Sequence, residues 1–394
     1  MRDLKVKKQT INSKITILCI ILGLMEPLGI SGAAKYLGSF WVYLDYVAVL
    51  CMYLSFAIGG YYTLLNLKRT KKLDTIELIF LLFEVVLLFS DVINDAALMT
   101  DIRYFLSAWT LIQVFKYAID RNVIDEMIST FILVNGIFII LNLLVIIFYN
   151  EGLYYDDRGW GTNYLLGYRN LNIYTYLPFI CFFGLKHRSR KRNVSLQFFL
   201  YMLIITASIF LSGSSTSLAI IAIIWFGVFF FAKREIPKYL NPAAVFLYSL
   251  VLSGLFIFFQ FQNQFGELIS YLFGKDSSFS RRIYIWSTAL LRIGQHPIIG
   301  NGNSSFSWGS YFDVAQCHNR YLDILYMGGI TLLVLFLCML IVSTMRSSKN
   351  VGMNLFVFSF WGYAILFLME GRRPDYVFYL LLYLYWNLNR KEMS

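Results

Sequence analysis

The sequence contains little charge and few of the residue types that hold metals or form disulfides. Only 14% of its 394 residues are charged, whereas 58% are hydrophobic, and the mean hydropathy is +0.61. A soluble protein of this length could not cover so much apolar surface. The three histidines and five cysteines show no metal-ligand spacing, and four of the cysteines lie inside apolar runs. The composition therefore excludes a soluble protein and implies neither a disulfide framework nor a metal centre.

Familiar catalytic and nucleotide-binding motifs are also missing. The sequence has no G-x-S-x-G nucleophile motif and no dinucleotide-binding fingerprint. The glycine-rich segment GNGNSS at 300–305 is not followed by Gly-Lys-Ser/Thr, and no strand is predicted before it. We therefore interpret 300–305 as a flexible, turn-rich loop.

Long apolar runs dominate what remains, and they predict an all-α, polytopic membrane protein. A helix crosses a bilayer with about 20 apolar residues. The aromatic residues, 28 tyrosines and 36 phenylalanines among them, suit the packing of spans and the membrane interfaces. We predict a single integral membrane domain over residues 1–394, with about twelve transmembrane helices. The predicted spans are 15–33 (uncleaved), 40–64, 73–92, 96–118, 127–149, 170–185, 194–212, 215–232, 241–261, 318–344, 351–370 and 375–389.

The basic residues predict the orientation of these spans. The net charge is +11, but most of this charge lies in short clusters between spans, which disfavours nucleic-acid binding and suits contact with anionic lipid. With a cytoplasmic N-terminus, 23 of the 34 lysines and arginines fall on the inner side. We therefore predict that both termini are cytoplasmic. The weakest span is 96–118, because it contains Asp101, Arg103 and Lys116.

The largest predicted extracytoplasmic loop covers 262–317, between the ninth and tenth spans. Within it, SSFSRRIYIWSTALLRIGQHP reads as an amphipathic helix that ends at Pro297. Its apolar residues recur at a spacing of three to four, opposite a face with Arg281 and Arg292. We expect this helix to lie flat on the outer membrane face. The apolar stripe comprises Ile283, Trp286, Leu290 and Ile293.

Polar residues gather at the predicted outer ends of the spans. An arginine there suits a pyrophosphate, because the guanidinium offers paired donors and keeps its charge in a low-dielectric site. A neutral histidine suits the deprotonation of a sugar hydroxyl near neutral pH. The same residue types also serve as ordinary interfacial anchors, and a polar turn between spans needs no ligand. The groups are Arg169 with Asn170, Ser212 to Ser217, Arg281 with Arg282, His318 to Asp323, and residues 370–375.

Several of these segments resemble the O-antigen ligase and polymerase superfamily, bacterial membrane enzymes that polymerise or attach lipid-linked glycans. Arg282 stands four residues before Trp286, and HPIIGNGNSSF (296–306) and HNRYLDILYMGGITLL (318–333) follow. The family's His-Asn-x-Tyr-Leu pattern is present as His318, Asn319, Tyr321 and Leu322. GYRN (167–170) resembles the segment that opens a middle span in capsule and exopolysaccharide polymerases, and SGSSTSL (212–218) resembles the family's Ser-Gly-Ser-Arg-Thr-Ala-Leu.

The resemblance implies catalytic roles for Arg282 and His318, with no cofactor, metal or nucleotide. His318 would be the base or would orient the acceptor, and Arg282 would neutralise the departing pyrophosphate. Ser215 stands where the family usually has an arginine, and Arg169 is the candidate to compensate for it. The predicted substrate-binding residues are Arg169, Asn170, Ser214, Ser215, Arg281, Asn319 and Tyr321.

By resemblance, the predicted function is a polysaccharide polymerase of the bacterial cytoplasmic membrane. It would transfer a glycan from undecaprenyl pyrophosphate to another lipid-linked repeat unit, alongside a flippase and a chain-length regulator of the same pathway. A ligase-like transferase that uses a different acceptor fits the same motifs. A lipid-linked oligosaccharide flippase is the third alternative, although it would be expected to carry its charges at mid-span.

Overall fold

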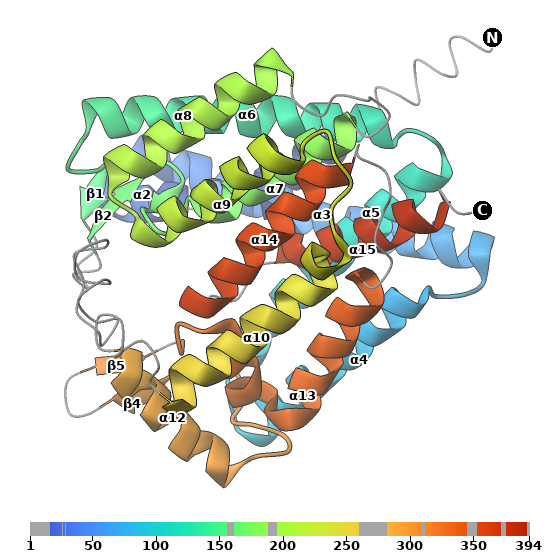
Figure 1. Ribbon diagram of the computed structural model, residues 1–394, viewed down its shortest axis with the longest axis vertical. Helices are drawn as coiled ribbons and strands as arrows, with labels where there is room; N and C mark the ends of the chain where they lie inside the picture. The colour runs from blue at the N-terminus through green and yellow to red at the C-terminus, as the bar shows by residue number, and fades with distance from the viewer. Residues whose placement is uncertain are drawn as a thin grey trace.

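The computed structural model is a bundle of α-helices with two small β-sheets (Figure 1). It describes residues 16–25, 27, 29–155, 161–187, 195–259, 282–308, 312–314, 316–344, 353–371 and 376–391. Among these, the four helices that are long and apolar enough to cross a membrane are Ser39–Thr70, Ile124–Phe148, Pro242–Phe259 and Arg320–Thr344. A fifth span results if two bent helices are counted as one. The structure thus confirms an α-helical fold with membrane-spanning character, whereas the total of twelve spans stays a prediction.

Every predicted span overlaps at least one helix in the described part of the chain. The first predicted span is broken, because the helix Thr16–Leu24 and α2 meet at 57°. Helix α12 confirms the predicted amphipathic helix within the long loop, although Arg281 lies outside the described residues. The helices are α2 (Gly29–Tyr36), α3 (Ser39–Thr70), α4 (Thr75–Ile93), α5 (Leu98–Asp120), α6 (Ile124–Phe148), α7 (Ile173–Lys186), α8 (Leu196–Ser212), α9 (Ser215–Phe231), the 3-10 helix η1 (Lys238–Leu240), α10 (Pro242–Phe259), α12 (Arg282–Gln295), α13 (Arg320–Thr344), α14 (Asn354–Met369) and α15 (Tyr376–Lys391).

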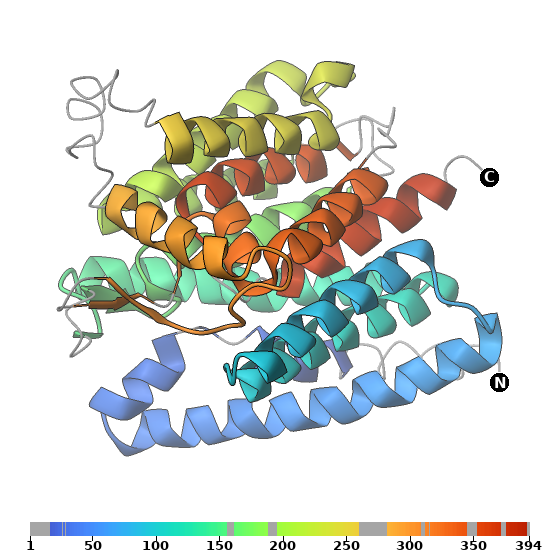
Figure 2. The same ribbon diagram turned by 90° about the horizontal axis from the view of Figure 1, so that it is seen from below.

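The strands occupy two of the polar segments between helices. Strands β1 (Tyr154–Tyr155), β2 (Thr162–Tyr164) and β3 (Gly167–Tyr168) form an antiparallel sheet. Strands β4 (Phe306–Trp308) and β5 (Phe312–Val314) pair antiparallel in a second sheet. Both sheets lie toward the left side of the bundle in Figures 1 and 2, and α12 packs near β4 on that side.

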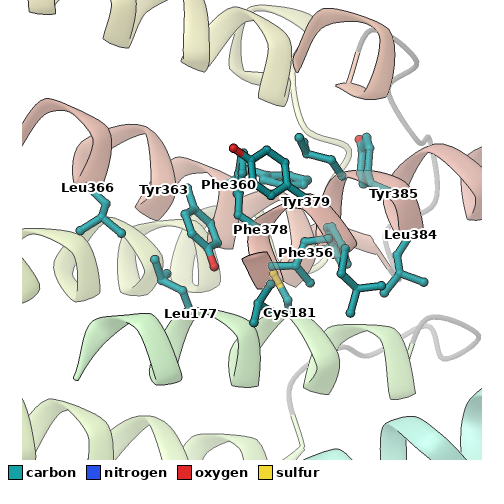
Figure 3. Close-up of a cluster of buried hydrophobic side chains, with 14 of the residues drawn as sticks. Leu177, Cys181, Phe356, Phe360, Tyr363, Leu366, Phe378, Tyr379, Leu384 and Tyr385 are labelled. Atoms are coloured by element: carbon teal, nitrogen blue, oxygen red, sulfur yellow. The ribbon is translucent and has the colours of Figure 1, made fainter. Parts of the chain in front are cut away.

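The centre of the bundle is built from α7, α14 and α15. Figure 3 shows Leu177 and Cys181 of α7 facing aromatic residues of α14 and α15. Phe360 and Tyr363 pack against Phe378 with ring centroids 6.2 and 4.8 Å apart. These helices are buried almost all round, which explains why their sequences are apolar on every face. Helices α7 and α15 thus pack against α14.

Two of the three charged residues that weakened the predicted span 96–118, Asp101 and Lys116, have partners in the structure, and Arg103 is exposed. Lys116 is only 5% exposed, and its Nζ lies 2.5 Å from Oε2 of Glu77 and 3.4 Å from Oδ2 of Asp74. At the opposite end of α5, Asp101 accepts a hydrogen bond from Asn303. A buried charge is tolerated when it is paired and hydrogen-bonded. Helix α5 therefore belongs to the bundle despite its charges.

Candidate functional site

The segment that begins at His318 is not one continuous helix. Helix α13 is broken at Gly328 and Gly329, whose backbone angles leave the helical region. Gly329 has a φ of 64°, and a β-carbon there would overlap the backbone of Ile298 and Ile299. Only glycine fits such a left-handed position in close contact with another segment. The polar head, 320–327, is thus a short helix separated from the apolar body, 330–344.

The loop 296–303 supplies the backbone partners that this break would otherwise lose. Asn301 N and Gly302 N donate to the carbonyls of Tyr326 and Met327 at 2.8 and 2.9 Å. On the other side of the break, Ile330 N donates to Pro297 O at 2.9 Å. Buried backbone groups need such partners. The glycine-rich loop predicted to be flexible is therefore a fixed part of the site's support.

The first half of the chain holds this loop in place. Asn303 N donates to Oδ1 of Asp91 at 2.7 Å, and Asn303 Nδ2 donates to Oδ1 of Asp101 at 2.7 Å. Ser90 Oγ donates to Met327 O and accepts from Gly302 N. These α4 and α5 residues could not be predicted as supports, because nothing in their own segments indicates a partner more than 200 positions away.

Asn319 caps the short helix and joins it to two neighbouring helices. Its Oδ1 accepts from Leu322 N at 3.1 Å, as expected of an asparagine N-cap. The same oxygen accepts from Ser253 of α10 at 3.0 Å, and Nδ2 donates to the carbonyl of Leu368 at 3.3 Å. Asn319 is fully buried. These bonds favour the supporting role suggested by its place beside His318.

His318 directly precedes Asn319, the residue that caps the short helix, and its backbone φ is 52°. A non-glycine residue in the left-handed region carries backbone strain, and such residues cluster at functional sites. Its Nδ1 lies 3.3 Å from Oε2 of Glu370, the residue that follows α14. The imidazole is 27% exposed, whereas the Glu370 side chain is 5% exposed. The described residues give Nε2 no hydrogen-bond partner, so this nitrogen is available to a ligand.

Arg282 contacts the other oxygen of the same carboxylate. Its Nη2 lies 3.1 Å from Oε1 of Glu370, and its Nη1 lies 3.7 Å from the sulfur of Met369. Burial raises the pKa of Glu370, but the hydrogen bond with His318 and the positive charge of Arg282 outweigh burial and lower it below its usual value. Glu370 is therefore ionised at neutral pH. The predicted pair, Arg282 and His318, is thus brought together by Glu370, for which no role was predicted from the sequence.

Arg169, Asn170 and Ser214 form a second cluster where β3 meets the turn between α8 and α9. Ser214 Oγ donates to Oδ1 of Asn170 at 2.9 Å and lies 2.8 Å from Oγ of Ser217. A β-carbon on Gly213 would lie 3.8 Å from Nη1 of Arg169, which is exposed. The structure therefore joins the predicted segments GYRN and SGSSTSL.

The remaining predicted residues differ in their accessibility. Ser215 is the first residue of α9 and is partly exposed. Tyr321 is buried, and its hydroxyl donates to the carbonyl of Phe246 at 3.1 Å.

Cys317 is not a candidate nucleophile, because burial raises the pKa of its thiol well above the usual value. Across the described ranges, no group of three or more His, Cys, Asp or Glu residues could hold a metal ion.

The apolar face of α12 packs against the protein. Trp286, Ala289 and Ile293 are buried, and Trp286 Nε1 donates to the carbonyl of Cys317 at 2.9 Å. Trp286 and Ile293, two residues of the predicted stripe, are therefore buried against the protein, and the Trp286 hydrogen bond holds α12 beside Cys317, the residue before His318. Part of the predicted stripe therefore faces the protein, and the position of α12 on the outer membrane face stays a prediction.

Residues 200–337 match the family model described as O-Antigen ligase. Within these bounds the chain is similar to an O-antigen ligase domain. The match confirms the predicted superfamily and includes Arg282 and His318, as well as the loop 296–303 and the break in α13. No curated protein and no solved structure matches the chain. Arg169 and Glu370 lie outside the O-antigen ligase match, so the supports of the site extend beyond the matched region.

Proposed function

We propose that this protein is a membrane glycosyltransferase of the O-antigen ligase type. It would transfer a glycan from a lipid-linked pyrophosphate donor to a hydroxyl group of an acceptor. The observation that carries the proposal is the position of Arg282 and His318 on the two oxygens of one buried carboxylate. This arrangement places an anion-binding guanidinium and a potential base at one point of the O-antigen ligase domain.

The proposed reaction is a single displacement at the anomeric carbon. His318 Nε2 takes the proton of the acceptor hydroxyl while the hydroxyl oxygen forms the new glycosidic bond. The bond from the anomeric carbon to the pyrophosphate oxygen breaks, and its electron pair leaves with the lipid pyrophosphate. Arg282 stabilises the charge that develops on this leaving group, which is a transition-state contribution. A single displacement inverts the configuration of the anomeric carbon.

The second cluster suits additional contacts with the donor or the acceptor. Arg169 is exposed and lies beside the Asn170–Ser214 pair, so it can supply the positive charge that Ser215 lacks. We propose that Arg281 contributes positive charge near the same substrate. Tyr321 supports the site indirectly, because it fixes α13 against α10. Asn319 supports His318 by capping the short helix.

The family description favours a ligase-type acceptor over another repeat unit. The two reactions share the donor chemistry and differ only in the molecule that offers the hydroxyl. The polymerase predicted from the sequence, with undecaprenyl pyrophosphate as its carrier, is the second candidate. It is favoured by GYRN at 167–170, which resembles a polymerase segment and lies in the second cluster.

Purified protein in lipid nanodiscs, supplied with a polyprenyl-pyrophosphate-linked glycan, tests the proposal. Two acceptors should be offered separately: a second donor molecule and a lipid-anchored sugar without pyrophosphate. Transfer to the anchored sugar with release of polyprenyl pyrophosphate supports the ligase type, and chain growth on the donor supports the polymerase. If the donor moves across the bilayer and no glycosidic bond forms with either acceptor, the protein is a flippase.

A further inference from the structure

We propose that Glu370 is a positioning residue that sets both the tautomer of His318 and the orientation of Arg282. This inference rests on the proposed function and adds a residue from outside the O-antigen ligase match. Its first basis is the place of Glu370 in the chain, directly after α14. The backbone N–H of Glu370 donates to Leu366 O at 2.7 Å, so the end of a buried helix fixes the carboxylate.

The carboxylate divides its two oxygens between the two partners. Oε2 lies 3.3 Å from Nδ1 of His318, and Oε1 lies 3.1 Å from Nη2 of Arg282. A carboxylate only accepts hydrogen bonds, so Nδ1 must carry the proton in this contact. In a neutral imidazole, Nε2 then has the free lone pair. Glu370 therefore selects the tautomer that can take a proton from an acceptor hydroxyl.

Exposure separates the role of Glu370 from that of His318. The imidazole is 27% exposed and can reach a ligand, whereas the carboxylate is 5% exposed and faces Arg282 and His318. When Nε2 takes a proton, the imidazolium is stabilised by the adjacent negative charge. Asp323 is the other buried acid in this region, but its Oδ1 accepts from Cys317 N at 2.5 Å. Glu370 is the acid within hydrogen-bonding distance of His318 in the described part of the chain.

The contact with Glu370 also fixes the orientation of the Arg282 guanidinium. A guanidinium has five N–H donors in one plane. Glu370 engages Nη2, and Nη1 lies 3.7 Å from the sulfur of Met369. The donors that these contacts leave free are the ones proposed to meet the phosphates of a donor. Without the carboxylate, the guanidinium could turn toward any anionic oxygen, and the paired contact with the leaving group would no longer be defined. Glu370 thus couples the base and the leaving-group contact through one side chain.

The variant Glu370→Gln tests this role, because it keeps the size of the side chain and removes its charge. We expect an apparent kcat lower by roughly 10²–10⁴-fold with an unchanged KM for the acceptor, a loss no larger than that of His318→Ala. Glu370→Asp keeps the charge and should retain more activity than Glu370→Gln. A merely structural residue would show the opposite order, since glutamine matches the shape of glutamate better than aspartate does.

A double variant removes the ambiguity of a folding defect. If Glu370 acts partly through His318, adding Glu370→Gln to His318→Ala should lower the residual rate by a clearly smaller factor than it lowers the wild-type rate, the remainder acting through Arg282, whereas independent effects would multiply. Glu77→Gln is the matched control, because Glu77 is a fully buried glutamate paired with a cation, Lys116. It should lower the thermal midpoint and leave the rate per folded molecule unchanged.

The outcomes separate this inference from the proposed function. Full activity of Glu370→Gln beside an inactive His318→Ala would overturn the positioning role and leave the transferase intact. Multiplicative losses in the double variant would also overturn it. An inactive wild type in the same nanodisc assay would instead overturn the proposed function.

Discussion

Nδ1 of His318 and Oε2 of Glu370 lie 3.3 Å apart although 52 residues separate them in the chain. The helix break at Gly328 and Gly329, the loop 296–303 and the buried end of α14 together create this contact. A histidine oriented by a carboxylate and open at its second nitrogen is an arrangement suited to general base catalysis.

Arg282→Lys should strongly reduce glycan transfer even though lysine keeps the charge. Lysine cannot reproduce the planar fork that contacts Glu370 and leaves donors for a pyrophosphate. We expect a rate reduction of roughly 10–10³-fold, measured as release of polyprenyl pyrophosphate by protein of matched folded amount. Arg292→Lys on the same helix is the control, and wild-type rates in Arg282→Ala would remove Arg282 from the site.

The pKa of Glu370 predicts how stability changes in acid. Its pKa in the folded protein lies below the ordinary 4.5, so the folded state favours the ionised form. The resulting stabilisation is fully present above pH 4.5 and is lost as the pH falls through the folded-state pKa. The difference in thermal midpoint between the wild type and Glu370→Gln should therefore shrink below pH 4.5. A difference that stays constant down to the acid limit of folding would contradict this assignment.

Gly329→Ala should destabilise the protein by at least about 1 kcal/mol. The added β-carbon requires an unfavourable φ and overlaps the backbone of Ile298 and Ile299. Gly60→Ala in α3 is the control, since a β-carbon there meets no atom within 4 Å and alanine favours a helix. Thermal unfolding in detergent measures both effects. An unchanged midpoint for Gly329→Ala would show that the break is not required.

The predicted topology places β1 outside and η1 inside the cell. Cysteines introduced at Tyr155 and Tyr239, which are 62% and 64% exposed, should differ in their access to an impermeant maleimide. Position 155 should label in intact cells, and position 239 only after permeabilisation. The unmodified chain gives the background of its five native cysteines. Labelling of both positions from the same side would refute the alternating arrangement.

The fold could be predicted from the sequence to a large extent, because span-length apolar runs and their separating basic clusters reflect local physical requirements. Helix α12 was also predictable from the spacing of Trp286 and Ile293. The contacts of Ser90, Asp91 and Asp101 were not, since they depend on segments distant in sequence that meet only in the folded chain. Glu370 remained without a role for the same reason: a lone acid at a span end does not reveal which cations it meets.

The decisive comparison is between the wild type and His318→Ala in the nanodisc transfer assay, with donor binding measured on the same samples. If His318 is the base, the variant should bind the lipid pyrophosphate donor as the wild type does and form glycosidic bonds roughly 10²–10⁴-fold more slowly. His296→Ala, an exposed histidine before Pro297, should transfer at the wild-type rate. Full transfer activity in His318→Ala would contradict the account.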